Sequence, residues 1–167
     1  KVPMDVLHGV LRLLLAEQVS IRNLPLILEA IAEARPTIQQ PNLLCEHVRQ
    51  RLEFQLVSGL KRDDGTLPLV QLAGQWEDIF AEYQIGGEGG LPEIALPPDT
   101  FNSLARSIGD KIAQASENGT YPAIVTSALR RRFLRTVLLS RGILNPVLSF
   151  EEIGLEAKPA LVGVAAP

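Results

Sequence analysis

The spacing of apolar residues changes near residue 62, and this change limits the possible folds more than any other feature. Before it, apolar side chains recur at helical spacing, as in the i, i+3, i+4, i+7 stripe that runs from Leu24 to Ile31. After the polar segment Lys61–Gly65, short apolar runs typical of strands alternate with helical patterns. We therefore predict an α+β chain, with a helical subdomain over residues 1–62 and a small α/β subdomain over residues 63–167.

Helix-starting and helix-stopping residues divide the first subdomain into three predicted helices. Pro25 suits a first helical turn, because the amide that it lacks would be unpaired there anyway. Pro36 stops the second helix, and Gly59 offers a C-terminal stop for the third. The expected helices run over residues 6–17, 24–35 and 41–59.

The second subdomain begins with a predicted strand over Thr66–Leu72, where Pro68 indicates an edge strand or a strand start. Trp76–Tyr83 is equally compatible with a short helix and with a strand. A strand–helix–strand series with short links implies a short mixed sheet, with at least one parallel pair, packed on helices. Further helices are expected over residues 97–118 and 127–140, and strands over residues 121–126, 146–150 and 160–164. The buried face of the helix over residues 127–140 is expected to comprise Leu129, Phe133, Val137 and Leu138.

The composition excludes several classes of protein. Sixteen basic and 19 acidic residues give a net charge of −3, which argues against a general nucleic-acid binder. The 46% hydrophobic fraction is too high for intrinsic disorder. A single cysteine forms no internal disulfide and favours a reducing compartment, and no apolar run approaches the roughly 20 residues of a membrane span. Because the chain opens with Lys1–Met4, we expect a fragment of a longer protein.

No catalytic, metal or cofactor site emerges from the motifs. Gly59–Gly65 has the spacing of a phosphate-binding loop, but Thr66 stands where the lysine is needed, and Gly86–Gly90 lacks a following Lys-Ser or Lys-Thr. Cys45 and His47 lie two apart on a predicted helix, so their side chains project to different faces. We expect Cys45 to be a small buried residue. Acidic pairs, including Glu151-Glu152, are interpreted as surface residues that aid solubility.

One basic cluster stands out on the helix predicted over residues 127–140. It consists of Arg130, Arg131, Arg132 and Arg135. The simplest interpretation is a solvated helix face. The alternative is a docking surface for an acidic partner. The cluster has no aromatic residues placed for base stacking, which disfavours nucleic acid as that partner.

Four segments carry ordered motifs. Leu13–Ala34 holds Leu-Leu-x-Glu-x-Val-Ser-Ile-Arg-Asn-Leu followed by an Ile-Leu-Glu-Ala helix, and Cys45–Leu52 holds Glu-His-Val-Arg. Pro122–Ser127 precedes the arginine-rich helix, and Pro146–Ile153 holds Leu-Ser-Phe-x-Glu-Ile. Together these segments resemble the flagellar and type III secretion export-gate family, and the resemblance extends from Val2 to Val164.

This resemblance implies the cytoplasmic side of a bacterial inner-membrane protein whose transmembrane half lies upstream. Members of that family assemble as nonameric rings and receive export chaperone–substrate complexes and components of the export ATPase. The resemblance therefore implies a non-enzymatic docking domain without a cofactor, in a flagellar or an injectisome export gate. Because the helical subdomain contributes ring contacts in the family, Arg22, Asn23, Glu29 and Arg35 are candidate subunit contacts.

Two further hypotheses follow. The segment Lys61–Gly65 is a candidate hinge that would let the second subdomain shift relative to the first during export switching. A function of another class, a small nucleotide-binding or hydrolytic α/β domain, would require a cleft with convergent polar groups.

Overall fold

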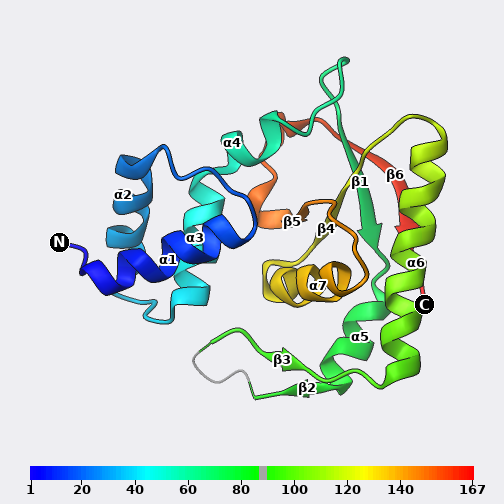
Figure 1. Cartoon of the computed structure of the whole chain (residues 1–167), viewed down its shortest axis with the longest axis horizontal. Coiled ribbons are helices and arrows are strands. Elements are labelled where there is room, and N and C mark those ends of the chain that lie inside the picture. The colour runs from blue at the N-terminus through cyan, green and yellow to red at the C-terminus, as the bar shows by residue number, and fades with distance from the viewer. Residues whose placement is uncertain (87–89) are drawn as a thin grey trace.

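The computed structural model describes residues 1–86 and 90–167, apart from the side chain of Leu155, and has two lobes side by side (Figure 1). The helical lobe, at the left of the figure, contains the first three helices, and the α/β lobe contains the sheet and the helices around it. The α+β class predicted from the sequence is confirmed. The helices of the first part of the chain are α1 (Met4–Ala16), α2 (Leu24–Ala34), α3 (Pro41–Arg51) and α4 (Glu53–Ser58).

The helical lobe is held together by the apolar stripes of α1, α2 and α3. Local signals set the helix starts: the Asn23 side chain accepts a hydrogen bond from the amide of Leu26 at 3.4 Å, and Pro25 and Pro41 occupy first-turn positions. The buried core comprises Val10, Leu14, Val19, Ile27, Ala30, Ile31, Ala34, Leu44, Cys45, Val48 and Leu52. The prediction that Cys45 is buried is confirmed.

The third predicted helix is interrupted. Leu52 lies between α3 and α4 with φ −93° and ψ 16°, and its amide bonds back to the carbonyls of Val48 and Arg49. This break turns α4 away from the helical core, so that Val57 packs under the sheet of the α/β lobe. Leu56, one residue earlier, packs against both cores, and the change of core therefore lies before the sequence-based boundary at residues 62 and 63.

The α/β lobe contains one main sheet, a small hairpin and three larger helices. Its elements are β1 (Leu67–Leu72), α5 (Gln75–Glu82), β2 (Gln84–Ile85), β3 (Glu93–Ile94), α6 (Pro98–Glu117), β4 (Ala123–Thr126), α7 (Ala128–Ser140), β5 (Val147–Ser149), the 3₁₀ turns η1 (Phe150–Glu152) and η2 (Leu155–Ala157), and β6 (Pro159–Ala165). The ambiguous segment Trp76–Tyr83 is helical, as α5. The predicted Gly86–Gly90 loop includes residues 87–89, which lie outside the described residues.

The four strands of the main sheet are parallel, in the order β5-β4-β1-β6, and β2 and β3 form a separate antiparallel pair. β1 is therefore central, so of the two alternatives predicted from Pro68 the edge strand is wrong and the strand start is right, because Pro68 is the second residue of β1. The amide of Leu67 donates to Lys158 beside β6, so the nitrogen of Pro68 faces the other neighbour, β4. Pairing with β4 begins only at Leu69, so the missing N–H of Pro68 leaves no gap in the ladder.

Both faces of the main sheet are covered, which explains why its strands are almost continuously apolar. Val70, Ile124 and Val147 pack against α5, α6 and α7 on one face. Leu69 and Val125 pack against Val57 of α4 and Ala157 of η2 on the other. The small strand–helix sheet expected from the sequence is thus confirmed, with the edge strand β5 nearest the helical lobe and α7 beside β5 and β4 (Figure 1).

The buried face of α7 differs from the predicted one. Leu129 is 45% exposed, and Phe133 is half-buried, with its ring edge-to-face with Phe80 at 5.5 Å between centroids. Val137 and Leu138 are buried as expected, together with Leu134. The remaining buried positions of α7 hold arginines: Arg130 and Arg131 meet carboxylates of neighbouring elements, and Arg135 meets backbone carbonyls. No helix within the described residues is long and apolar enough to cross a membrane.

Candidate functional site

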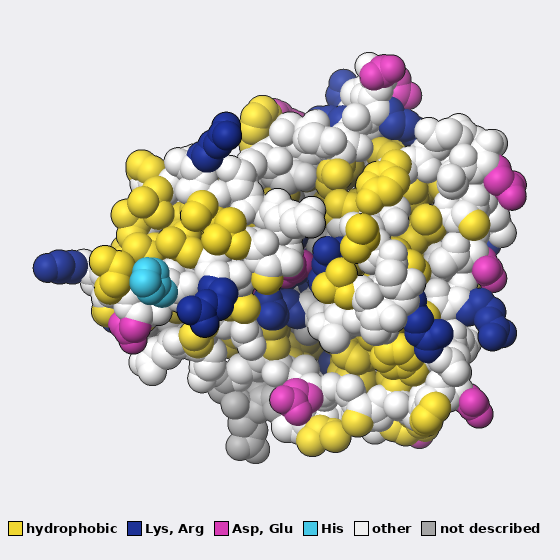
Figure 2. All heavy atoms as spheres, in the orientation of Figure 1, with side chains coloured by type: hydrophobic (Ala, Val, Ile, Leu, Met, Phe, Trp, Pro, Cys, Tyr) yellow, Lys and Arg dark blue, Asp and Glu magenta, His cyan; other side chains and the backbone are white. Residues whose placement is uncertain are grey.

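Five charged side chains are buried together where the two lobes meet. We call them the interlobe ion network: Glu17 after α1, Glu46 and Arg49 in α3, Arg131 in α7, and Glu152 in η1. Figure 2 shows acidic and basic side chains lying next to one another in the middle of the molecule, between the helical lobe and the α/β lobe. The network therefore joins surfaces that are far apart in the sequence.

Arg131 is the centre of the network and is 0% exposed. Its Nε and Nη2 donate to the two carboxylate oxygens of Glu46 at 2.7 and 2.8 Å. Its Nη1 and Nη2 donate to the two oxygens of Glu17 at 2.6 and 2.7 Å. Two carboxylates thus bind one guanidinium group in the paired geometry that its planar fork allows.

Arg49 makes a second two-point contact across the lobes. Its Nε and Nη2 donate to Glu152 at 2.7 and 3.2 Å, and Nη2 also donates to the carbonyl of Val147 at 3.3 Å. Glu152 is held in place by a capping box, in which it accepts from the amide of Ser149 while the Ser149 hydroxyl accepts from the amide of Glu152. The start of η1 therefore holds the carboxylate of Glu152 in the position in which Arg49 binds it.

The charges of the network nearly balance. Burial of Glu17 opposes its ionisation, but the hydrogen bond and charge of Arg131, with the charges of Arg49 and Arg132, hold its pKa below the ordinary value. Burial would lower the pKa of Arg131, but Glu17 and Glu46 raise it. Glu17 and Arg131 are thus kept ionised by their partners, and removal of either arginine of the network leaves buried carboxylates without compensation.

The network joins all four motif segments identified in the sequence. Glu17 comes from the first segment, Glu46 and Arg49 from the second, Arg131 from the arginine-rich helix that follows the third, and Glu152 from the fourth. The interpretation of Glu152 as a surface residue is wrong, because its side chain is fully buried against Arg49. The sequence does contain one indication of this burial. Glu46 and Arg49 lie on the same side of α3 as the apolar residues Cys45 and Val48, and not on its polar face.

The basic cluster of α7 is mostly buried. Arg130 donates to both oxygens of Glu77 at 2.7 to 3.1 Å and to Gln84 at 2.9 Å, and Arg131 lies in the network. Arg135 is buried against the carbonyls of Leu144 and Asn145. The interpretation of this cluster as a solvated face is therefore wrong for three of its members, since carboxylates and carbonyls compensate their burial. Arg132 is half-buried, 3.6 Å from Glu17.

The candidate subunit contacts lie on the helical lobe, around α2 and away from the network. Arg22 and Glu29 are exposed, and Glu29 lies 3.6 Å from Arg51. Asn23 caps α2, and Arg35 donates to the carbonyl of Lys1 at 3.0 Å. Their role in subunit contact stays a prediction. Within residues 1–86 and 90–167, no group of three potential metal ligands is present.

The candidate hinge Lys61–Gly65 is a hydrogen-bonded turn. The amide of Arg62 donates to the carbonyl of Thr66 at 2.8 Å, and the amide of Gly65 donates back to Arg62 at 2.9 Å. Gly65 has φ +85°, which favours glycine. The chain therefore crosses between the lobes before this turn, near Leu56, and the buried ion pairs of the network also join the lobes.

Comparison with known proteins identifies the family of the chain. The FHIPEP family model matches residues 1–158 of the chain. The chain belongs to the FHIPEP family. The resemblance to flagellar and type III secretion export gates seen in the motifs is thereby confirmed. FHIPEP relatives include the flagellar biosynthesis protein FlhA of Caulobacter vibrioides, which is 38% identical over 155 residues.

Solved structures of similar fold add two comparisons to the FHIPEP match. The complex of the Chlamydia pneumoniae proteins CdsV and CdsO contains a chain with a TM-score of 0.85 and 25% identity, over 98% of this chain and 48% of that one. The nonameric EscV cytosolic domain from the type III secretion system has a TM-score of 0.75 and 21% identity, over 94% and 46%. The match to FlhA covers 93% of this chain and 22% of that protein, so the chain spans about a fifth of the relative's length.

Proposed function

We propose that this chain is the C-terminal cytoplasmic part of a bacterial flagellar type III export gate, a domain that binds other proteins and catalyses no reaction. The single observation that carries the proposal is the 38% identity to FlhA over nearly the whole chain. The parent protein would lie in the inner membrane, with this part on the cytoplasmic side.

The interlobe ion network suits a docking platform. Because Arg131 binds carboxylates of both α1 and α3 while it belongs to α7, the helical lobe and the α/β lobe present their surfaces in one defined arrangement. The carboxylates of Glu17, Glu46 and Glu152 are all engaged by arginines, so none of them is free to act as a general acid or base. Structural coupling of two binding surfaces, rather than catalysis, is what this arrangement provides.

The proposed partners are copies of the same protein in a ring, export chaperone–substrate complexes and components of the export ATPase. The nonameric EscV domain and the CdsV–CdsO complex support self-assembly and partner binding as properties of this fold. Arg22, Asn23, Glu29 and Arg35 remain the proposed subunit contacts, and Arg132 remains a proposed docking residue, since it is the cluster member with the most accessible side chain. A shift between the lobes during export switching would require the network to rearrange.

A second candidate is an injectisome export gate, favoured by the likeness to the EscV domain. The two candidates share the fold and the docking role. They differ in the export system that the domain serves, and only an experiment in cells separates them.

The test is a graft. The segment of Caulobacter FlhA that aligns with this chain is replaced by residues 1–158, and swimming motility and secretion of flagellar proteins are measured in a strain that lacks its own gate. We expect export to be restored. The control graft carries Leu14→Asp, which places a charge in the core of the helical lobe and should abolish export. The same graft in EscV tests the injectisome candidate. A membrane-inserted graft that supports export in neither system would contradict the proposal.

A further inference from the structure

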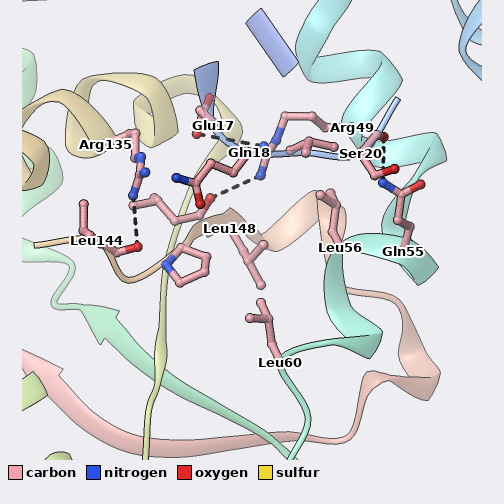
Figure 3. Close-up of a pocket in the computed structure, with 13 residues that line it drawn as sticks. Glu17, Gln18, Ser20, Arg49, Gln55, Leu56, Leu60, Arg135, Leu144 and Leu148 are labelled. Carbon is pink, nitrogen blue, oxygen red and sulfur yellow. Dashed lines mark hydrogen bonds and ion pairs between the residues drawn. The ribbon is translucent and has the colours of Figure 1, made fainter. Parts of the chain in front are cut away.

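A cleft of about 300 Å³ opens between the lobes, next to the interlobe ion network (Figure 3). Its walls come from the connector after α1, from Arg49 of α3, from α4 and Leu60 beyond it, and from the α7–β5 region. The cleft therefore borders both lobes, and any ligand within it touches both. Its volume is that of roughly ten water molecules, which accommodates a short peptide segment but not a folded domain.

Arg135 lines this cleft as a buried cation without a counter-ion. The residue is 9% exposed, and its Nη1 donates only to backbone carbonyls, those of Asn145 at 3.2 Å and Leu144 at 3.4 Å. Its Nε is buried without a hydrogen-bond partner, and among the described residues no carboxylate pairs with it. Arg49, on the same cleft, is by contrast neutralised by Glu152. A buried guanidinium group with unused donors is costly unless an anion meets it.

One side of the cleft is apolar, whereas Glu17, Gln18, Ser20 and Gln55 line other parts of it. Leu56, Leu60 and Leu148 lie together on the side of the opening away from Arg135, and Leu144, which is 62% exposed, stands at the mouth (Figure 3). A small inorganic anion at Arg135 would leave this apolar wall uncovered. A ligand that carries both a negative group and a neighbouring apolar group would satisfy the whole surface.

We propose that this cleft binds a carboxylate side chain of an extended peptide, with an adjacent apolar side chain against the leucine wall. The carboxylate accepts hydrogen bonds from Arg135, and the apolar side chain packs on Leu56, Leu60 and Leu148. The proposal concerns ligand chemistry and is independent of the export role, because it is measured on the isolated chain while the export role is measured by the graft in cells.

The test uses two synthetic peptides, acetyl-Ala-Leu-Glu-Leu-Ala-amide and its Glu→Gln analogue, each with a fluorescent label. Binding to the folded chain is followed by fluorescence anisotropy. We expect the Glu peptide to bind at least about tenfold more tightly than the Gln peptide, since a hydrogen bond to a charged group is worth a factor of this size. Sodium acetate, used as a competitor, tests whether the carboxylate alone is sufficient.

Two variants locate the binding. Arg135→Gln removes the cation and should weaken binding of the Glu peptide at least about tenfold, while Arg12→Gln, an exposed arginine on α1, should leave it unchanged. Leu144→Glu places a competing carboxylate at the mouth and should also weaken binding. Its matched control is Leu139→Glu, since Leu139 is similarly exposed on α7 but does not line the cleft.

The outcomes are distinguishable. Equal affinity for both peptides, no binding at millimolar peptide, or unchanged affinity in Leu144→Glu would each overturn the proposal. Acetate that competes as effectively as the Glu peptide, mole for mole, would overturn the role of the leucine wall. If Arg135→Gln does not fold, the Leu144→Glu and Leu139→Glu pair decides the question, because both substitutions lie at exposed positions.

Discussion

The guanidinium group of Arg49 binds both carboxylate oxygens of Glu152, at 2.7 and 3.2 Å, although 103 positions of sequence separate the two residues. Both side chains are buried, with exposed fractions of 3% for Arg49 and 0% for Glu152. Two buried charges of this kind are favourable only in each other's presence. The pair therefore makes the helical lobe and the α/β lobe depend on one another for stability.

Arg131→Ala should destabilise the domain by about 3–5 kcal/mol, because it leaves the carboxylates of Glu17 and Glu46 buried without their partner. The matched control is Arg132→Ala, one position along α7. Arg132 is more accessible and lies 3.6 Å from Glu17, so its loss should cost under about 1 kcal/mol. Urea unfolding followed by circular dichroism measures both. Similar costs for the two variants would show that the buried network contributes no more than a surface pair.

The Arg49–Glu152 contact should show strong coupling in a double-mutant cycle. Arg49→Met and Glu152→Leu should each lower the free energy of unfolding by about 3–5 kcal/mol, since each substitution leaves the charge of the other residue buried without its partner. The double variant strands neither, so it should be more stable than the sum predicts, with a coupling energy of about 1–3 kcal/mol. Additive effects of the two substitutions would argue against a direct contact.

Stability should fall in acid partly through Glu17. Its pKa in the folded state lies below the ordinary value of 4.5, so its ionised form stabilises the fold above that pH. This stabilisation is lost as the pH falls below 4.5 and through the lowered pKa. The stability difference between the wild type and Glu17→Gln should therefore be largest near neutral pH and shrink in acid.

Unfolding by urea at a series of pH values measures this difference. Glu82→Gln, at an exposed position on α5, serves as the control and should show a small difference that changes little with pH. A Glu17→Gln difference that stayed constant into strong acid would mean that the network does not depend on this ionisation.

Cys45 should be chemically inert in the folded protein. Burial, together with the adjacent charge of Glu46, raises the pKa of its thiol to about 12. The reactive thiolate is therefore roughly a thousandfold scarcer than for an ordinary thiol. Iodoacetamide at mildly alkaline pH should modify Cys45 only after urea unfolds the chain, as mass spectrometry can detect. Rapid modification under native conditions would show that α3 opens readily.

Gln18→Gly should stabilise the domain by about 1 kcal/mol. Gln18 follows α1 with φ +61°, in the left-handed region that strains any residue with a Cβ. It occupies the helix-ending position at which glycine is preferred, because its amide bonds to Leu15 while the amide of Val19 bonds to Leu14. Thermal unfolding measures the gain. A loss of stability would indicate that the Gln18 side chain makes a contribution larger than the backbone strain.

Local patterns predicted much of the fold. Helical spacing and proline positions predicted α2 nearly to its ends, and the strand predicted over residues 121–126 contains β4 (Ala123–Thr126). The central place of β1 could not be predicted, because Pro68 is tolerated only through the late start of its pairing with β4. Strand order depends on contacts between segments that are distant in the sequence, and the spacing of apolar residues along the chain carries no information about such contacts.

The candidate site was predictable only in part. The motif segments predicted the elements that supply the network, but local patterns placed Arg131 and Glu152 at the surface and indicated no partner for Glu17, Glu46 or Arg49. A buried Glu152 and an exposed one have the same local sequence, and only the partner across the lobes decides between them. The same applies to Arg131, whose burial depends on carboxylates far away in the chain.

The order of the network residues along the chain has a consequence for biosynthesis. A ribosome delivers Glu17, Glu46 and Arg49 well before Arg131 and Glu152 exist. Until then, these groups lack Arg131 and Glu152 as partners and keep much of their hydration, although Arg49 and Glu17 can pair with each other at 3.9 Å. Docking of the lobes therefore waits for the synthesis of Glu152, and the finished domain matures after translation of its last motif rather than progressively during it.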